Sequence, residues 1–189
     1  MRNWAIRRHV GFVLCALLIS FSCGNKRDFK DELLQMQSRH VILSLDSMDC
    51  RNIEKKIMEN QPVLKLVVYS DTLTCSSCRL HEMQKWDPFL KRMKHYKEDI
   101  NTYFIFRPLA KDMDVFNFTM KAFPPSYPIY VDTTNIFLRM NPQIPDNPIM
   151  HTFLLDENNN VLLVGNPLEN EKIEEMFWQI VEEKLGKRE

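Results

Sequence analysis

The chain has 189 residues, 25 basic and 25 acidic side chains, and only five cysteines. This length is enough for one domain with its own hydrophobic core. The balanced charge and the lack of a dense basic patch argue against a nucleic-acid-binding protein, and so few cysteines exclude a dense disulfide scaffold.

An export signal is predicted at the N-terminus. Residues 1–22 combine a basic start with an apolar run over 10–21 that is short for a membrane span, which needs roughly 20 apolar residues. The boundary Ser22-Cys23-Gly24 resembles the lipobox of bacterial lipoproteins, in which the cysteine becomes the new N-terminus and carries the lipid. We therefore expect a lipid on Cys23. A plain secreted protein and an uncleaved anchor are the alternatives.

The predicted cut divides the chain into three parts: a signal peptide over 1–22, a polar tether over 23–38 and a folded domain over 39–189. Removing the signal removes three arginines and no acid, which leaves 22 basic against 25 acidic side chains. The mature protein would face the periplasm of a Gram-negative bacterium, anchored by its lipid to the cell membrane or the outer membrane.

Strands and helices are predicted to alternate in the first half of the domain, from the spacing of apolar residues. The expected elements are a strand over 41–45, a helix over 50–60, a strand over 63–70, a helix over 76–96, a strand over 102–107 and a helix over 110–123. Pro88 falls inside the helix over 76–96 and should kink it, because proline removes a backbone donor.

The second half of the domain should end in a β-hairpin and a helix. The expected elements are a strand over 127–132, a short helix or turn over 133–140, strands over 150–155 and 161–164, and a helix over 169–185. Residues 156–160 tolerate left-handed conformations and should form the hairpin turn. This order predicts an α/β fold with a mixed sheet. It resembles the thioredoxin fold, a three-layer α/β/α arrangement, with an N-terminal strand–helix extension.

Cys75 and Cys78 follow one predicted strand and begin the next predicted helix. Two thiols three residues apart can close a small disulfide ring and reopen it. The positive end of the helix dipole favours a thiolate at Cys75. We expect Cys75 to attack a disulfide and Cys78, more buried one turn further on, to resolve the mixed disulfide. A static structural disulfide is the alternative.

Other side chains near the dithiol have less certain roles. Ser76 and Ser77 could donate hydrogen bonds to either sulfur, and Arg79 either adds positive charge or is an ordinary solvated residue. Cys50 could be a small buried apolar residue, a third redox thiol or the site of an intermolecular bond. Cys15 lies in the predicted signal peptide.

Four segments resemble the exported thioredoxin-like proteins of the TlpA/ResA group, and more narrowly the thioredoxin-like lipoproteins of Bacteroidetes. They are 66–70 with 75–78, 118–124 with 127–132, 152–156, and 158–165. The similarity covers about 63–185. It implies a thioredoxin-like fold, a redox-active Cys75–Cys78 pair without a cofactor, exported thiol or disulfide proteins as substrates, and a separate redox partner.

Relatives in this group place a cis-proline immediately before the strand that corresponds to 152–155. Counting back from Thr152 puts that position at Met150, whereas Pro148 lies two residues earlier. Pro148 is therefore the candidate cis-proline if the loop is re-registered. Met150 should be trans, since a cis bond before a residue other than proline costs about 2.5–4 kcal/mol. Relatives also carry a tryptophan where Thr74 precedes the dithiol.

Metal binding is the alternative chemistry for the dithiol. His81 lies three residues after Cys78 on nearly the same helix face, and His151 follows the expected cis-proline position. Together with Cys75, these side chains could hold copper or zinc.

The function predicted from the sequence is a membrane-tethered thiol–disulfide oxidoreductase that exchanges disulfides with exported proteins. The alternative is a non-enzymatic lipoprotein of the same fold that binds a partner, senses redox state or handles a metal. A measured reduction potential separates the two, because structural disulfides typically lie below about −300 mV.

Overall fold

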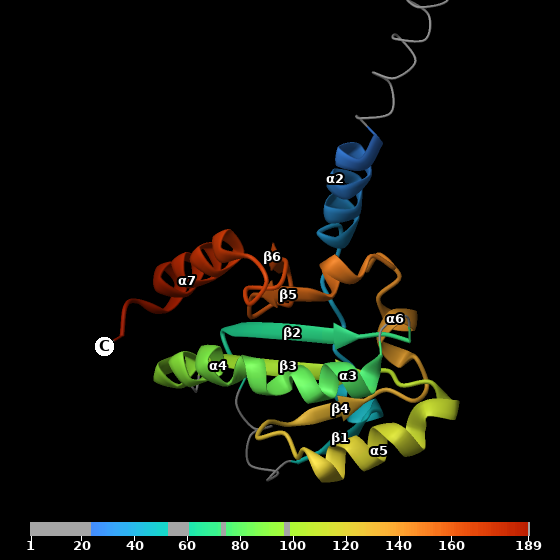
Figure 1. The fold of residues 1–189 in the computed structure, drawn as a ribbon. Coiled ribbons are helices and arrows are strands. Elements are labelled where there is room, and N and C mark those ends of the chain that lie inside the picture. The colour runs from blue at the N-terminus through green and yellow to red at the C-terminus, as the bar shows by residue number, and fades with distance from the viewer. Residues whose placement is uncertain (1–23, 53–60, 73–74, 97–98, 189) are drawn as a thin grey trace, which may run out of the picture.

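A computed structural model describes residues 24–52, 61–72, 75–96 and 99–188. The predicted signal peptide, the lipid site Cys23, Thr74 and most of the helix predicted over 50–60 lie outside the described residues. Within the described part, a six-stranded mixed sheet carries helices on both faces (Figure 1).

The strands of this sheet are β1 (Asp49–Arg51), β2 (Leu64–Ser70), β3 (Ile100–Phe106), β4 (Ile129–Val131), β5 (Thr152–Leu155) and β6 (Val161–Val164). Their spatial order is β1-β4-β3-β2-β5-β6. Strands β2, β3 and β4 are parallel, whereas β1 pairs antiparallel with β4, β5 with β2, and β6 with β5. The hairpin predicted over 150–164 is confirmed as β5 and β6.

The helices are α2 (Gly24–Met36), α3 (Ser76–His81), α4 (Asp87–Met93), α5 (Met113–Ala122), α6 (Ile136–Met140) and α7 (Glu171–Leu185). Short 3₁₀ turns precede β1 at Leu45–Ser47, join α3 to α4 at Glu82–Trp86, precede α5 at Ala110–Asp112 and precede β5 at Pro148–His151. Pro88 lies in the first turn of α4, where a missing N–H is tolerated. The prediction of one helix over 76–96 with a kink at Pro88 is therefore wrong, because the helix is interrupted over Glu82–Trp86 and Pro88 begins the second part.

Alternation along the strands builds a core on each face of the sheet. Leu64 and Leu66 of β2 join the core that α3, α4, α5 and α7 cover. Val67 and Tyr69 of the same strand join the second core, which includes Phe137 of α6 and the buried end of α2. The three-layer α/β/α fold with a mixed sheet that is predicted from the sequence is confirmed.

The connections between the parallel strands bring the starts of α3 and α5 together. The chain moves from β2 to β3 to β4 in one direction across the sheet. Right-handed crossovers then place the intervening helices on the same face. Because α3 follows β2 and α5 follows β3, both helices begin beside the carboxyl ends of neighbouring strands. Cys75 lies at this edge.

The N-terminal part of the domain differs from the prediction. The strand predicted over 41–45 is wrong, and the first strand is β1. Val41 is fully buried, but its N–H donates to the carbonyl of Asn159 in the hairpin turn. The N–H of Ile42 donates to the side chain of Asn141. The backbone N–H groups of these β-prone residues thus donate to a turn carbonyl and a side-chain oxygen instead of to a neighbouring strand.

Two further segments differ from their predicted conformations. Cys50 belongs to β1, so the helix predicted to begin there is wrong for its first residues. Residues 24–36, predicted as tether, form α2, and Met36 at its end is fully buried. Within the described residues, the strand of the extension is thus preceded by a helix that the sequence did not predict. Tethering itself stays a prediction.

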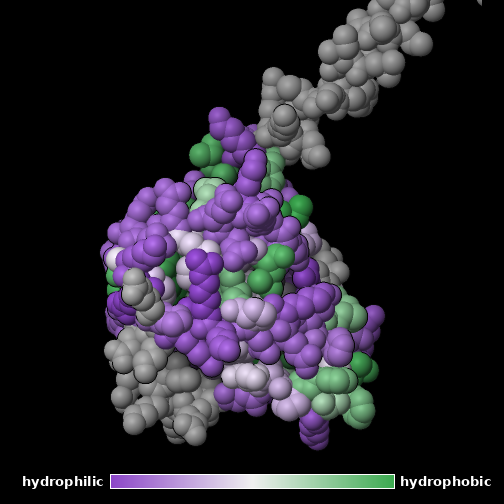
Figure 2. Space-filling model, turned by 60° about the vertical axis from the view of Figure 1, so that its left-hand side comes forward, coloured by the Kyte–Doolittle hydropathy of each residue, from purple (hydrophilic) through white to green (hydrophobic). Residues whose placement is uncertain are grey.

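The surface in Figure 2 is mainly hydrophilic, with apolar side chains in small separate groups. Among the residues that the structure describes, no helix has the length and apolar character needed to cross a bilayer.

Candidate redox site at the start of α3

Cys75 and Cys78 form a disulfide at the N-terminus of α3. Their Cα atoms lie 5.2 Å apart, within the range that a disulfide requires. Cys75 is the N-cap residue of α3, and both cysteines are exposed. Because the first turn of α3 lies at the surface, both residues are exposed, and the expectation that Cys78 is the more buried of the two stays a prediction.

The backbone of α3 supports the sulfur of Cys75. The N–H of Cys78 donates to Cys75 Sγ at 3.3 Å, and the N–H of Arg79 donates to the Cys75 carbonyl at 2.9 Å. An N-cap side chain normally accepts such a hydrogen bond through oxygen. After reduction the same donor can stabilise a thiolate on Cys75. Ser76 is buried and Ser77 is half-buried.

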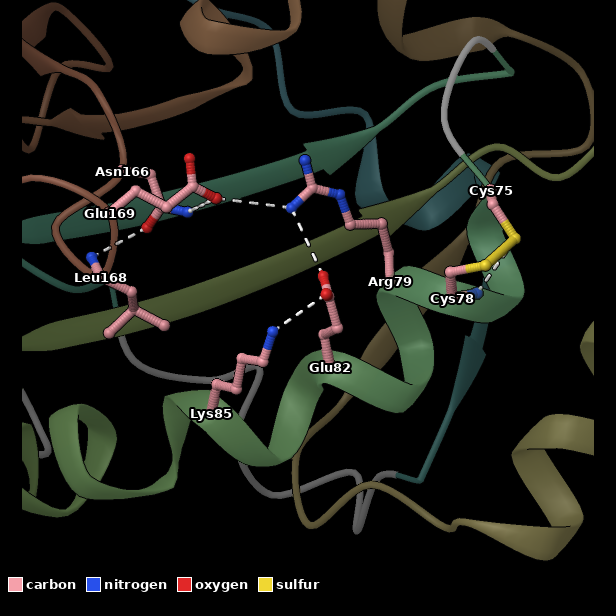
Figure 3. A network of polar contacts seen from close by, with 8 residues as sticks. All are labelled: Cys75, Cys78, Arg79, Glu82, Lys85, Asn166, Leu168 and Glu169. Carbon is pink, nitrogen blue, oxygen red and sulfur yellow. Dashed lines mark hydrogen bonds and ion pairs between the residues drawn. A yellow bond between two sulfur atoms is a disulfide. The ribbon is translucent and has the colours of Figure 1, made fainter.

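Arg79 directs its charge away from the sulfurs. Its guanidinium lies 3.7 Å from Glu82 on the next turn and 3.6 Å from Glu169, which precedes α7 (Figure 3). Lys85 also pairs with Glu82, at 2.9 Å, and the side chain of Asn166 donates to Glu169 at 2.8 Å. This network connects α3 to the loop before α7. Arg79 is thus a partly exposed surface residue that bridges two elements.

The four proposed metal ligands do not form one site. The ring of His81 packs edge-on against Phe123, with ring centroids 4.7 Å apart. His151 is 3 % exposed, its Nε2 donates to the carbonyl of Pro145 at 2.9 Å, and its Nδ1 lies 3.9 Å from Asp71. Within the described ranges, no three side chains of the metal-binding types are placed to share an ion. The set of Cys75, Cys78, His81 and His151 is therefore wrong as a preformed metal site.

The loop before β5 also differs from the prediction that Pro148 is a cis-proline. No peptide bond among the described residues is cis, so the bonds preceding Pro148 and Met150 are both trans. Pro148 begins a 3₁₀ turn in which the Asn147 side chain accepts from the N–H of Ile149. This cap stabilises the turn with a trans proline in its first position.

Cys50 lies far from the dithiol in the sheet. It belongs to the edge strand β1, and β4 and β3 separate that strand from β2. Its side chain is half-buried opposite Tyr130, whose hydroxyl donates to the sulfur. Burial raises the pKa of the Cys50 thiol, and the neighbouring Asp49 raises it further. These surroundings disfavour a thiolate, so Cys50 lacks the features of an attacking thiol.

Two hollows border the part of the chain from Cys75 to Arg79. One, of about 280 Å³, is lined by Cys75 itself together with Leu109, Asp112 and Val115 at the start of α5. The other, of about 710 Å³, lies toward α7, and neither cysteine lines it. Its lining includes Val68, Met83, Trp86, Phe104, Arg79 and Glu169. The smaller hollow is therefore the one that communicates directly with the exposed sulfur.

Leu109, Asp112 and Val115 were not identified from the sequence. The helical spacing of α5 could have indicated that Val115 is exposed, because Val115 lies off the side of the helix that carries the buried Phe116. Its proximity to Cys75 follows only from the placement of α5 beside α3, which the sequence pattern does not fix.

Several solved structures are similar to this chain. A putative thiol:disulfide interchange protein DsbE from Chlorobium tepidum shares 16% identity over 63% of this chain and 80% of that chain, with a TM-score of 0.45. A putative protein disulfide isomerase from Bacteroides thetaiotaomicron shares 17% identity over 78% and 94% of the two chains, with a TM-score of 0.45. A thioredoxin-like protein from Bacteroides caccae shares 15% identity over 65% of this chain, with a TM-score of 0.43, and this chain spans only 42% of that protein. No family model matches the sequence, and no match was found among curated proteins.

Proposed function

We propose that this thioredoxin-like chain is a thiol–disulfide oxidoreductase that acts on exported proteins while a lipid on Cys23 holds it at the membrane. The observation that carries the proposal is the exposed Cys75–Cys78 disulfide at the start of α3. A disulfide on the surface at a helix N-terminus can be reached by a second thiol. The sequence features of residues 1–23 support export and lipid attachment.

The exchange needs no cofactor. In the reduced protein, the thiolate of Cys75 attacks one sulfur of a substrate disulfide, and the other substrate sulfur leaves as a thiolate. The thiolate of Cys78 then attacks Cys75 Sγ, which closes the Cys75–Cys78 bond and releases the second substrate thiolate. Two electrons pass to the substrate, the released thiolates take up protons from water, and a dithiol protein that serves as redox partner restores the reduced state.

Insulin reduction tests the proposal. Purified protein should reduce insulin with dithiothreitol as the electron source, and Cys75→Ser should lose this activity. Cys50→Ser is the matched control, because it removes a thiol that lies elsewhere in the sheet, and its activity should equal that of the wild type. A Cys75→Ser variant that keeps full activity would remove the proposal.

The reduction potential distinguishes an active dithiol from a structural bridge. Equilibration with glutathione redox buffers should give the Cys75–Cys78 bond a reduction potential above about −300 mV. Structural disulfides, which resist reduction by glutathione, typically lie below this value. A lower potential, together with no insulin reduction, would favour the non-enzymatic alternative.

A further inference from the structure

Helix α2 is fixed to the folded domain, although its first residue directly follows Cys23 in the sequence. Met36 at its end is fully buried, and Leu33 packs against the second core. Toward the middle of the helix, the carboxylate of Glu32 accepts a hydrogen bond from the side chain of Asn147 at 3.0 Å. The remaining turns project from the domain beyond the loop that precedes β5 (Figure 1). Whatever is attached ahead of α2 is therefore held at a defined place relative to the sheet.

An exposed apolar patch lies where α2 meets the loop before β5. Phe29 is three residues before Glu32, on the same side of the helix, and Ile149 is two residues after Asn147. Phe29, Pro148 and Ile149 line the same hollow. Phe29 is 43% exposed and Ile149 is 66% exposed. These three side chains, from segments far apart in the sequence, are called the α2 patch below.

The α2 patch lies near the predicted lipid site. Five residues of helix, about 7.5 Å, separate Gly24 from Phe29. The headgroup region on each side of a bilayer is about 5–7 Å thick. A lipid on Cys23 therefore brings Phe29 to the outer edge of the headgroups, and a tilt of α2 toward the loop brings Ile149 there as well.

A bilayer fits this patch better than a charged partner does. The sequence of α2 contains three basic and three acidic residues, so its charges balance. Attraction to anionic lipids is then weak, and contact depends on the apolar side chains. The bilayer is also the apolar partner that a lipid on Cys23 would keep within reach of the α2 patch at all times.

We propose that the α2 patch is a membrane-contact surface. Phe29 and Ile149 lie among the lipid headgroups and hold the domain against the bilayer in one orientation. This inference rests on the lipid attachment in the proposed function, and it adds a second contact with the same membrane. Stable anchoring by lipid chains commonly needs a second such contact.

Brominated lipids test the contact, because bromine quenches tryptophan fluorescence only at close range. Ile149→Trp and Phe29→Trp each place a reporter in the α2 patch. Met176→Trp is the matched control, because Met176 is 48% exposed on α7, which covers the other face of the sheet. The lipid-carrying protein is inserted into phosphatidylcholine vesicles with bromine on the upper part of the acyl chains. After subtraction of the wild-type signal, both patch reporters should lose about half of their fluorescence, since apolar side chains of interfacial helices reach about 5–10 Å into this region.

The control reporter should keep its fluorescence. Full fluorescence of Ile149→Trp and Phe29→Trp on protein that sediments with the vesicles would overturn the membrane-contact surface and leave the lipid anchor in place. Equal quenching of all three reporters would overturn it too, because the domain would then have no fixed orientation. Protein that does not sediment with vesicles would overturn the lipid anchor and this surface together, whereas insulin reduction tests the dithiol chemistry separately.

Discussion

The guanidinium of Arg79 lies 3.6 Å from the carboxylate of Glu169, on the side of α3 that faces away from the disulfide. The positive side chain that directly follows Cys78 in the sequence is therefore paired with an acid before α7. The donor that does reach the Cys75 sulfur is the backbone N–H of Cys78.

Arg79→Gln should have little effect on either stability or exchange rate. Its ion pairs involve partly exposed groups, and such pairs contribute about 0–1 kcal/mol. We expect the free energy of unfolding, measured in urea, to fall by less than about 1 kcal/mol and the insulin reduction rate to stay within about twofold. Arg92→Gln, which removes an ion pair with Glu174 and a cation–π contact with Trp178 far from the dithiol, is the control for the exchange rate. A much larger loss of rate in Arg79→Gln alone would give the arginine a direct role at the dithiol.

The two cysteines should differ in reactivity although both are exposed. Only Cys75 accepts a backbone hydrogen bond as the N-cap residue, and this donor stabilises its thiolate. In fully reduced protein at pH 7, iodoacetamide should modify Cys75 about tenfold faster than Cys78, as followed by mass spectrometry of peptides. Equal rates would mean that either sulfur can attack.

The same asymmetry predicts which variant traps a substrate. Cys78→Ser should accumulate a mixed disulfide with a peptide disulfide, because no second thiol remains to resolve it. Cys75→Ser should accumulate much less. Non-reducing electrophoresis measures the adduct, and more adduct with Cys75→Ser would reverse the assigned roles.

Alkaline pH should weaken the fold through Cys50 and Tyr130. Burial raises the pKa of both groups, and Tyr130 donates its hydroxyl to the Cys50 sulfur. A raised pKa means that the folded state holds the proton more tightly, so the stabilisation is complete below the unfolded thiol value of about 8.5 and is lost as pH rises through the folded value. The urea midpoint should therefore fall between pH 8 and pH 10. Cys50→Ser keeps a hydrogen-bonding group that does not titrate, and its midpoint should fall less. An identical fall of the urea midpoint in Cys50→Ser and in the wild type would show that Cys50 does not contribute to the loss of stability at alkaline pH.

The sequence predicted the parts of the fold whose apolar pattern matches their burial. Strand β2 carries an apolar run over 66–69 because both of its faces are covered, and α7 shows helical spacing because one side packs against the core. Val41 misled the prediction, since its buried side chain indicated a strand although its N–H donates to the Asn159 carbonyl in the hairpin turn. The spacing of apolar residues indicates which side chains are buried, but it does not indicate which group accepts the hydrogen bond from each backbone N–H.

Only part of the candidate site was predictable from the sequence. The spacing of Cys75 and Cys78 predicted a disulfide at the start of a helix. The exposure of Cys78 and the wall formed by Val115 depend on how α3 and α5 pack together, which involves residues far apart in the chain. His151 looked like a ligand beside the dithiol, yet it lies buried against Tyr69, with ring centroids 5.1 Å apart.

Asp132 should be a main determinant of stability, although nothing in the sequence singled it out. It is 1% exposed after β4, and its carboxylate accepts from the N–H groups of Ile136 and Phe137 at 2.9 Å each. These bonds satisfy the first turn of α6, and hydrogen bonds to a charged group contribute about 1.5–3 kcal/mol each. Asp132→Ala should lower the free energy of unfolding by about 2–4 kcal/mol in urea, whereas Asp132→Asn, which keeps an oxygen acceptor, should lose less. Asp46→Ala, at an exposed site, is the control. A loss in Asp132→Ala no larger than that of Asp46→Ala would show that the buried carboxylate does not hold α6 in place.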